Sequence, residues 1–138
     1  MEHTFTGTLK WAKIYPGQES KKYDPSGKWS LNFYPKDKET RERIRGLQLR
    51  APLKEDEDGF FYTFTRKVAD PYLKGNIIVK GEDGQDLTDA IGNGSEANVT
   101  VEVYQWDNNF GKGNGAKIIK VEMVNFIPYT KDDKALPV

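Results

Sequence analysis

The sequence predicts a mainly β protein in which five antiparallel strands close into a small barrel, with one short helix and long loops. Five runs alternate apolar and polar residues or are rich in β-branched and aromatic types, as strands are. No two runs are joined by a long helix of the kind that a parallel crossover needs. Closure of the sheet removes exposed strand edges, so a barrel is favoured. The runs cover residues 4–15, 28–34, 60–67, 98–106 and 117–127.

The first two strands end at prolines. β-branched and aromatic residues fill the first strand, which Pro16 terminates. A polar loop leads to the second strand, which Pro35 terminates. Within it Trp29, Leu31 and Phe33 share one face by the two-residue period, so we expect these three side chains in the core.

A charged segment from Asp37 to Leu49 has a helical pattern. Asp37 is a suitable N-cap, and Ile44 and Leu47 are three residues apart on one face. We therefore expect a short helix lying on the surface. Two shorter segments flank the third strand: a solvated acidic turn at residues 54–59 and an extended piece at residues 76–80.

The third strand has two faces of similar character, and the pattern leaves open which of them is inward. If Phe60 and Phe64 are buried, Tyr62 belongs to the core with them, and a ligand meets Phe61 and Lys67 instead. The first face carries Phe60, Tyr62, Phe64 and Arg66, and the second carries Phe61, Thr63, Thr65 and Lys67.

The last two strands form a long hairpin. Val99, Val101 and Val103 lie on one face, which leaves Tyr104 and Trp106 on the opposite, wet face. Large rings on a wet face beside lysines suit the stacking of bases and the binding of phosphates. The glycine-rich segment 111–117 is predicted to be the tip of this hairpin, with Gly111, Gly113 and Gly115 allowing it to flex.

Composition limits the class of protein. At 138 residues without cysteine, the chain fits one domain, which we place at residues 1–130, followed by a short flexible tail at residues 131–138. No apolar run is long enough to span a membrane, and the N-terminal residues do not resemble a signal peptide, so a cytoplasmic location is expected. The net charge is zero, but residues 10–50 carry +6 and residues 82–109 carry −7. This separation predicts a locally positive face, although two solvated faces explain it equally well.

Three segments together resemble a family of single-stranded DNA-binding proteins of tailed bacteriophages, which have an OB-fold. They are Gly7–Lys13, Gly27–Tyr34 and Ile91–Ser95, spread over most of the chain in the family's order. The resemblance implies an OB-fold that binds single-stranded DNA without sequence preference during phage replication or recombination. It also implies phage replication or recombination proteins as partners, with no catalysis, no cofactor and no membrane; the oligomeric state stays open. Many replication proteins recruit partners through an acidic tail; residues 131–138 are not acidic overall, so recruitment of a polymerase or helicase by this route is not expected.

In an OB-fold, single strands lie across the second and third strands, between the loops after strands one and four. The first of these loops offers Tyr15, Lys21, Lys22 and Tyr23, and the second offers Trp106, Phe110, Lys112 and Lys117. Further candidates on the strands are Lys10, Trp11, Lys13, Tyr34, Tyr62, Arg66, Lys67 and Tyr104. For each of them a structural role in the core or at the barrel ends is the alternative.

Two other functions compete with DNA binding. Exposed Trp and Tyr also stack on sugars, so an OB-fold carbohydrate-binding module is one alternative, and a protein-interaction domain is another. Lysines beside the rings favour a phosphate backbone over a neutral glycan. An enzyme is the weakest hypothesis, because the chain has one His and no Cys for a metal site, and its paired acids lie in solvated turns.

Overall fold

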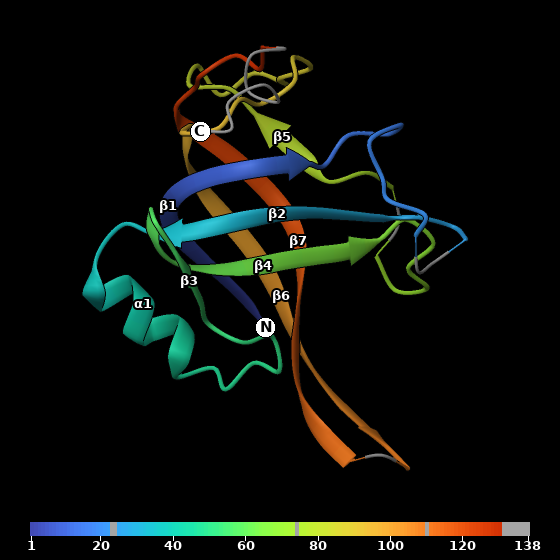
Figure 1. Ribbon diagram of the computed structural model, residues 1–138. Coiled ribbons are helices and arrows are strands. Elements are labelled where there is room, and N and C mark those ends of the chain that lie inside the picture. Colours follow the sequence, from blue (N-terminus) through green and yellow to red (C-terminus); the bar gives the residue numbers. More distant parts are fainter. Residues whose placement is uncertain (23–24, 74, 110, 131–138) are drawn as a thin grey trace.

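The computed structural model describes residues 1–22, 25–73, 75–109 and 111–130 (Figure 1). Tyr23, Phe110 and the predicted tail at residues 131–138 lie outside these described residues. The elements in chain order are β1 (Glu2–Lys13), β2 (Lys28–Pro35), α1 (Lys38–Arg45), β3 (Lys54–Asp56), β4 (Gly59–Lys67), β5 (Ile78–Lys80), β6 (Glu96–Asn108) and β7 (Gly111–Asn125).

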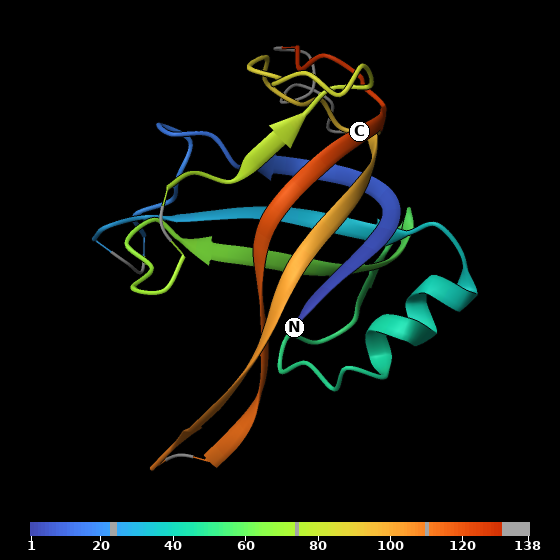
Figure 2. The ribbon, with the colours of Figure 1, turned by 180° about the vertical axis from the view of Figure 1, so that it is seen from behind.

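Five strands form a closed barrel. β1 pairs antiparallel with β2 and with β6, β2 pairs with β4, and β6 pairs with β7. The ring closes where Thr65 of β4 lies beside Lys117 of β7. β1 curves strongly, so that it belongs to the layer with β2 and β4 in Figure 1 and joins β6 and β7 on the other side of the barrel in Figure 2.

The predicted five-stranded barrel with one short helix is confirmed, but the sheet departs from the predicted antiparallel arrangement in two respects. First, β4 and β7 run parallel. A closed ring with an odd number of strands cannot reverse direction at every contact, so closure itself requires one parallel pair. Second, two short strands lie outside the ring: β3 forms a hairpin with β4, and β5 runs parallel to β7. The acidic segment predicted as a turn therefore contributes an edge strand.

The barrel interior is apolar and aromatic, and it confirms the predicted inner face of β2. Trp29, Leu31 and Phe33 are buried, and from β6 Val99 and Val101 meet them in the same core. On β4 the inward face is the one with Tyr62, Phe64 and Arg66, all buried. The alternating outward residues of β2 and β4 therefore form the outer surface of this layer.

The helix forms at the predicted place but is shorter. The Asp37 side chain accepts a hydrogen bond from the backbone N–H of Thr40 at 2.8 Å, so Asp37 is the N-cap as predicted. Ile44 is buried, and Leu47 packs partly against the core. The helix ends at Arg45; Gly46 is its C-cap with a right-handed backbone, and Gln48 then adopts a left-handed conformation with φ of 53°, which a continuing helix does not allow.

The distal part of the last hairpin extends beyond the barrel (Figure 1). Residues 103–108 of β6 pair with residues 111–116 of β7, and we call this two-stranded extension the ribbon. The glycine-rich segment is thus part of strand β7, and the prediction that residues 111–117 form the hairpin tip is wrong. Within the described residues no helix has the length and apolar character needed to cross a membrane.

Candidate functional site

Two aromatic rings on the ribbon lie over glycines of the partner strand. Tyr104 is paired with Gly115 and Trp106 with Gly113. A Cβ atom at Gly113 would be 2.9 Å from Cζ2 of Trp106, and one at Gly115 would overlap the Tyr104 ring. A larger residue at either position would displace its ring, and the rings cover the glycine backbone as aromatic residues often do across a sheet.

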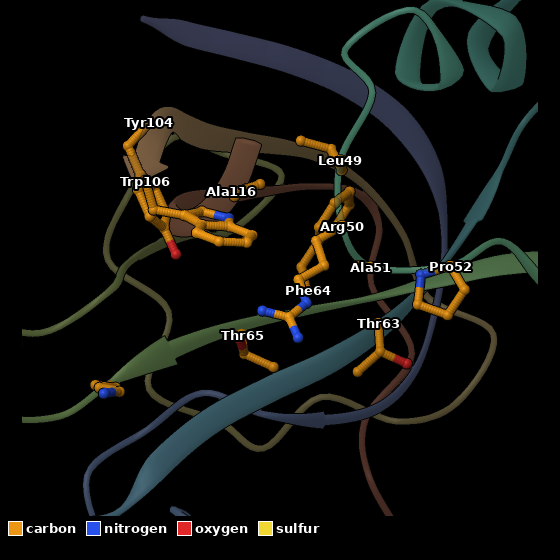
Figure 3. Close-up of a pocket in the computed structure, with 12 residues that line it drawn as sticks. Leu49, Arg50, Ala51, Pro52, Thr63, Phe64, Thr65, Tyr104, Trp106 and Ala116 are labelled. Carbon is orange, nitrogen blue, oxygen red and sulfur yellow. The ribbon is translucent and has the colours of Figure 1, made fainter. Parts of the chain in front are cut away.

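A groove of about 670 Å³ lies between the ribbon and the barrel (Figure 3). One wall is formed by Tyr104 and Trp106, and the floor by the outward residues Thr63, Thr65 and Lys67 of β4. The other wall is the connection between α1 and β3, residues 49–52. The groove is therefore an open surface with rings on one side and hydroxyl and cationic groups around them.

The connection is attached to the ribbon by hydrogen bonds. Asn114 donates from Nδ2 to the carbonyl of Leu47 at 2.9 Å, and its own carbonyl accepts from the backbone N–H of Arg50 at 3.0 Å. As a result the guanidinium carbon of Arg50 lies 5.1 Å from the centre of the Trp106 ring, in a cation–π contact. Figure 3 shows the Arg50 side chain extending beside this ring toward β4.

A smaller hollow of about 310 Å³ continues the groove, since Thr65, Lys67, Tyr104 and Ala116 line both. It adds Lys28 of β2, together with Asp70 and Lys117. Lysine and arginine side chains therefore follow the groove along its length, from Arg50 at the connection to Lys67 and Lys28 at the ends of β4 and β2.

Lys117 is held by a carboxylate. Its Nζ lies 2.6 Å from Oδ2 of the buried Asp70 and 4.6 Å from the centre of the Tyr104 ring. Burial of the carboxyl raises the pKa of Asp70, but hydrogen bonds from Lys117 and from the backbone N–H groups of Leu73 and Tyr72 more than offset this and lower it to about 2. The charge of Lys117 is thus compensated by Asp70, and its ammonium lies beside the Tyr104 ring.

Three of the candidate residues on β2 and β4 are buried. Tyr34 packs against Phe61 and donates from its hydroxyl to Asp56 at 2.6 Å, and burial first, then this hydrogen bond, raises its pKa. Tyr62 lies in the core, as expected for the inward face of β4. Arg66 donates from its guanidinium to the backbone carbonyls of Ile118, Leu73 and Gly75, and so joins β4 to β7 and to the segment after β4.

The loop between β1 and β2 lies away from the groove. The Tyr15 hydroxyl donates to the carbonyl of Leu87 at 2.9 Å, and burial, followed by the nearby charge of Asp89, raises its pKa to about 12. Lys21 and Lys22 are exposed on this loop. None of these residues lines the groove beside the ribbon.

By strand alternation Lys112 belongs to the face of the ribbon opposite the rings, although it and Trp106 both border a second hollow of about 640 Å³. It is paired with Asp107, and residues directly opposite each other on antiparallel strands share a face. Asp107 directly follows Trp106 in β6, so the two side chains point to opposite faces of the ribbon. Arg50, rather than Lys112, supplies the cation at Trp106.

The remaining candidates, Lys10, Trp11 and Lys13, lie near the end of β1. Lys10 forms an ion pair with Asp58. The Trp11 side chain is exposed, and Lys13 lies 5.8 Å from the ring of Tyr129. Trp11 and Lys13, but not Lys10, border a separate hollow at this end of the barrel.

Arg50 and the threonines of β4 line the groove but were not among the residues predicted from the sequence. Thr63 and Thr65 alternate with Tyr62 and Phe64 along β4. Once the two rings are known to point inward, the alternation predicts that both threonines point outward. Nothing in the pattern connects Arg50 with Trp106. In the part of the chain that the structure describes, no three His, Cys, Asp or Glu residues are grouped in a way that could hold a metal ion.

A closed barrel with the strand order β1–β2–β4–β7–β6 is an OB-fold. No protein-family model and no curated protein matches this sequence. Among solved structures, the chain is similar to gp2.5, a single-stranded DNA-binding protein encoded by bacteriophage T7. The TM-score is 0.68 and the identity 18%, over 100% of this chain and 94% of the other.

It is also similar to the single-stranded DNA-binding protein of bacteriophage Enc34. The C-terminally truncated form matches with a TM-score of 0.65 and 12% identity, over 93% of this chain and 88% of the other. The complex of the Enc34 protein with single-stranded DNA matches with a TM-score of 0.57 and 14% identity, over 94% and 89%. At the level of the fold, these matches confirm the resemblance to phage single-stranded DNA-binding proteins.

Proposed function

We propose that this protein binds single-stranded DNA without sequence preference, in the groove between the ribbon and β4. The observation that carries the proposal is the pair of rings, Tyr104 and Trp106, each supported by a glycine and facing a groove with Arg50 and Lys67 on its other sides. The similarity in fold to phage proteins of this function, one of them in complex with single-stranded DNA, supports it.

Stacking explains why the binding would tolerate any sequence. Every base has a π-face, and each base stacked on an aromatic side chain contributes roughly 1 to 3 kcal/mol. In a duplex the faces are covered by neighbouring bases, so the rings favour a single strand. When Arg50 is displaced from the Trp106 ring, it can pair with a phosphate without leaving the groove.

Cations along the groove make the binding dependent on salt. Each phosphate contact with a single strand releases condensed counterions and lowers the logarithm of the affinity by about 0.7 for each tenfold rise in salt. Arg50, Lys67 and Lys28 are the cations that the groove offers for these contacts. Protection of DNA strands during phage replication or recombination is the process in which we expect this activity.

The test is fluorescence anisotropy of labelled oligo-dT, with RNA and duplex of the same length, at two salt concentrations. We expect salt-sensitive binding to the single strand. Trp106→Ala should lower the affinity about 5- to 150-fold, which corresponds to the free energy of one stacked base. The matched control is Phe60→Ala, because Phe60 is an exposed ring that packs against Arg41 outside the groove. Absence of binding at low salt, or equal effects of the two variants, would contradict the proposal.

A further inference from the structure

Trp11 has a strained backbone in an exposed position. Its φ is 53°, a left-handed conformation that bulky residues rarely adopt, and its side chain is 46% exposed. The strain occurs where the register of β1 with β2 shifts, between Lys10 and Lys13. Glycine would fit this backbone without strain, and the exposed ring contributes little to the core. Strained residues of this kind concentrate at binding sites, which directs attention to what surrounds the ring.

The strained conformation is held by the segment that precedes β6. The backbone N–H of Trp11 donates to Oδ1 of Asn93 at 2.7 Å. Two residues before Trp11, the backbone N–H of Leu9 donates to the carbonyl of Ser95 at 2.8 Å, and the carbonyl of Leu9 accepts from the N–H of Gly94 at 2.9 Å. These three bonds fix the backbone at Trp11, so the ring is presented in a defined place.

The ring borders a hollow of about 400 Å³ with a second aromatic side chain. Trp11 and Tyr129 both line it, together with Lys13, Gln18 and Asn93. The Lys13 ammonium lies 5.8 Å from the centre of the Tyr129 ring. Two rings, a cation and two amide side chains match the chemistry of a nucleotide: a π-face to stack, a phosphate, and polar base edges.

A row of residues connects this hollow with the groove at the ribbon. Lys13 of β1 is paired with Ser30 of β2, and Ser30 is paired with Thr65 of β4. Paired residues on adjacent strands share a face, so these three side chains lie in one row across the outer layer. Lys13 lines the hollow at Trp11, and Thr65 lines the groove. With strands about 4.8 Å apart, the row is roughly 10 Å long.

We propose that Trp11 is a second base-stacking site. A single DNA strand that occupies the ribbon groove then continues along the row to Trp11 and Tyr129, so that its footprint covers the whole outer layer of β1, β2 and β4. This inference rests on the proposed function, and it adds a second stacking site at the other end of the bound strand. It predicts that affinity rises with oligonucleotide length until both ends are occupied.

A length series of oligo-dT, measured with wild type and Trp11→Gly, tests this. Glycine removes the ring and also the backbone strain, so the variant should fold and melt no lower than wild type. We expect its affinity for short oligonucleotides to be unchanged, and its affinity for long ones to be about 5- to 150-fold weaker than that of wild type. Trp106→Ala should weaken binding at all lengths.

The outcomes separate this inference from the proposed function. Suppose that wild type binds, and that Trp11→Gly has either the same affinity as wild type or the same fold-loss of affinity at every oligonucleotide length. The second site is then contradicted, and the proposed binding at the ribbon groove is unaffected. If wild type binds no single strand, the proposed function is overturned together with it.

Tryptophan fluorescence provides an independent readout. The chain has three tryptophans, and Trp29 is buried, so in a Trp106→Phe variant the exposed indole is that of Trp11. We expect long oligo-dT to protect this indole from acrylamide quenching and short oligo-dT to leave it accessible. Equal accessibility of the indole with long and short oligo-dT would contradict the second stacking site, and a protein partner would then be the alternative ligand of the hollow at Trp11.

Discussion

Trp29 and Trp106 come from similar alternating runs and meet opposite environments. Trp29 is 2% exposed, packs in the barrel core and donates from Nε1 to the carbonyl of Tyr15 at 3.0 Å. Trp106 lies on the ribbon over the backbone of Gly113, beneath a guanidinium. Both tryptophans lie in alternating strands, so their local sequence does not distinguish them. The parts of the protein that surround each ring decide whether it stabilises the fold or is available to a ligand.

The same comparison applies to the cations. Arg66 has its guanidinium among backbone carbonyls inside the barrel, whereas Arg50 lies on a surface ring. The core residues should therefore affect stability, and the groove residues should affect binding. The following predictions test how cleanly the two sets separate.

Trp29→Ala should have the largest effect. Removal of a buried tryptophan from a packed core costs about 3 to 5 kcal/mol of unfolding free energy. We expect less than about 1 kcal/mol for Trp106→Ala, because that ring covers glycine on a projecting ribbon. Urea unfolding of the two variants measures both values, and equal losses would show that the ribbon is part of the folding core.

Asp70→Asn should remove about 2 kcal/mol of unfolding free energy at neutral pH. The folded pKa of about 2 is below the ordinary value near 3.8, so the ionised carboxylate stabilises the fold above about pH 4. This contribution is lost as the pH falls through 2. Urea unfolding of both proteins across this range should show their stabilities converging in acid. A constant difference would mean that the Lys117 ion pair is not its source.

Gly113→Val should weaken binding by about tenfold, or roughly 1.4 kcal/mol, with little change in stability. The added side chain pushes the Trp106 ring from its place, while a β-branched residue suits a strand. Gln105→Val is the control, because Gln105 alternates with the rings and points to the other face of the ribbon. If both variants bind equally well in anisotropy titrations, the glycine support of the ring is not needed.

The smallest expected effect separates two lysines. Lys67→Ala should reduce the slope of log affinity against log salt by about 0.7, the value for one phosphate contact with a single strand. Lys112→Ala should leave the slope unchanged, because Lys112 is opposite Asp107 on the far face of the ribbon. Salt titrations of both variants measure these slopes. A reduced slope for Lys112→Ala and an unchanged slope for Lys67→Ala would indicate that the DNA lies on the far face of the ribbon.

The sequence predicted the local features of this fold well. The alternation in β2 identified Trp29, Leu31 and Phe33 as core, and the charged segment after it identified Asp37 as the N-cap, because both signals are contained in a few consecutive residues. Alternation also divided β4 into two faces. It could not say which one is inward, since aromatic residues occur on both.

The features that depend on distant contacts were not predicted. Glycines 113 and 115 suggested a flexible tip, because their reason is a pair of rings on another strand. Arg50 reaches Trp106 only because Asn114 bonds to the connection after α1. The parallel contact between β4 and β7 follows from closure of the ring, a property of the whole sheet.

The central claim, that bases stack on the ribbon rings, is tested most directly by photocrosslinking. Oligo-dT with a photoreactive halogenated base is bound to the wild-type protein and irradiated, and the crosslinked peptides are mapped by mass spectrometry. We expect crosslinks at Tyr104 and Trp106 in the groove. Crosslinks confined to the segment between β5 and β6, with none on the ribbon, would contradict it.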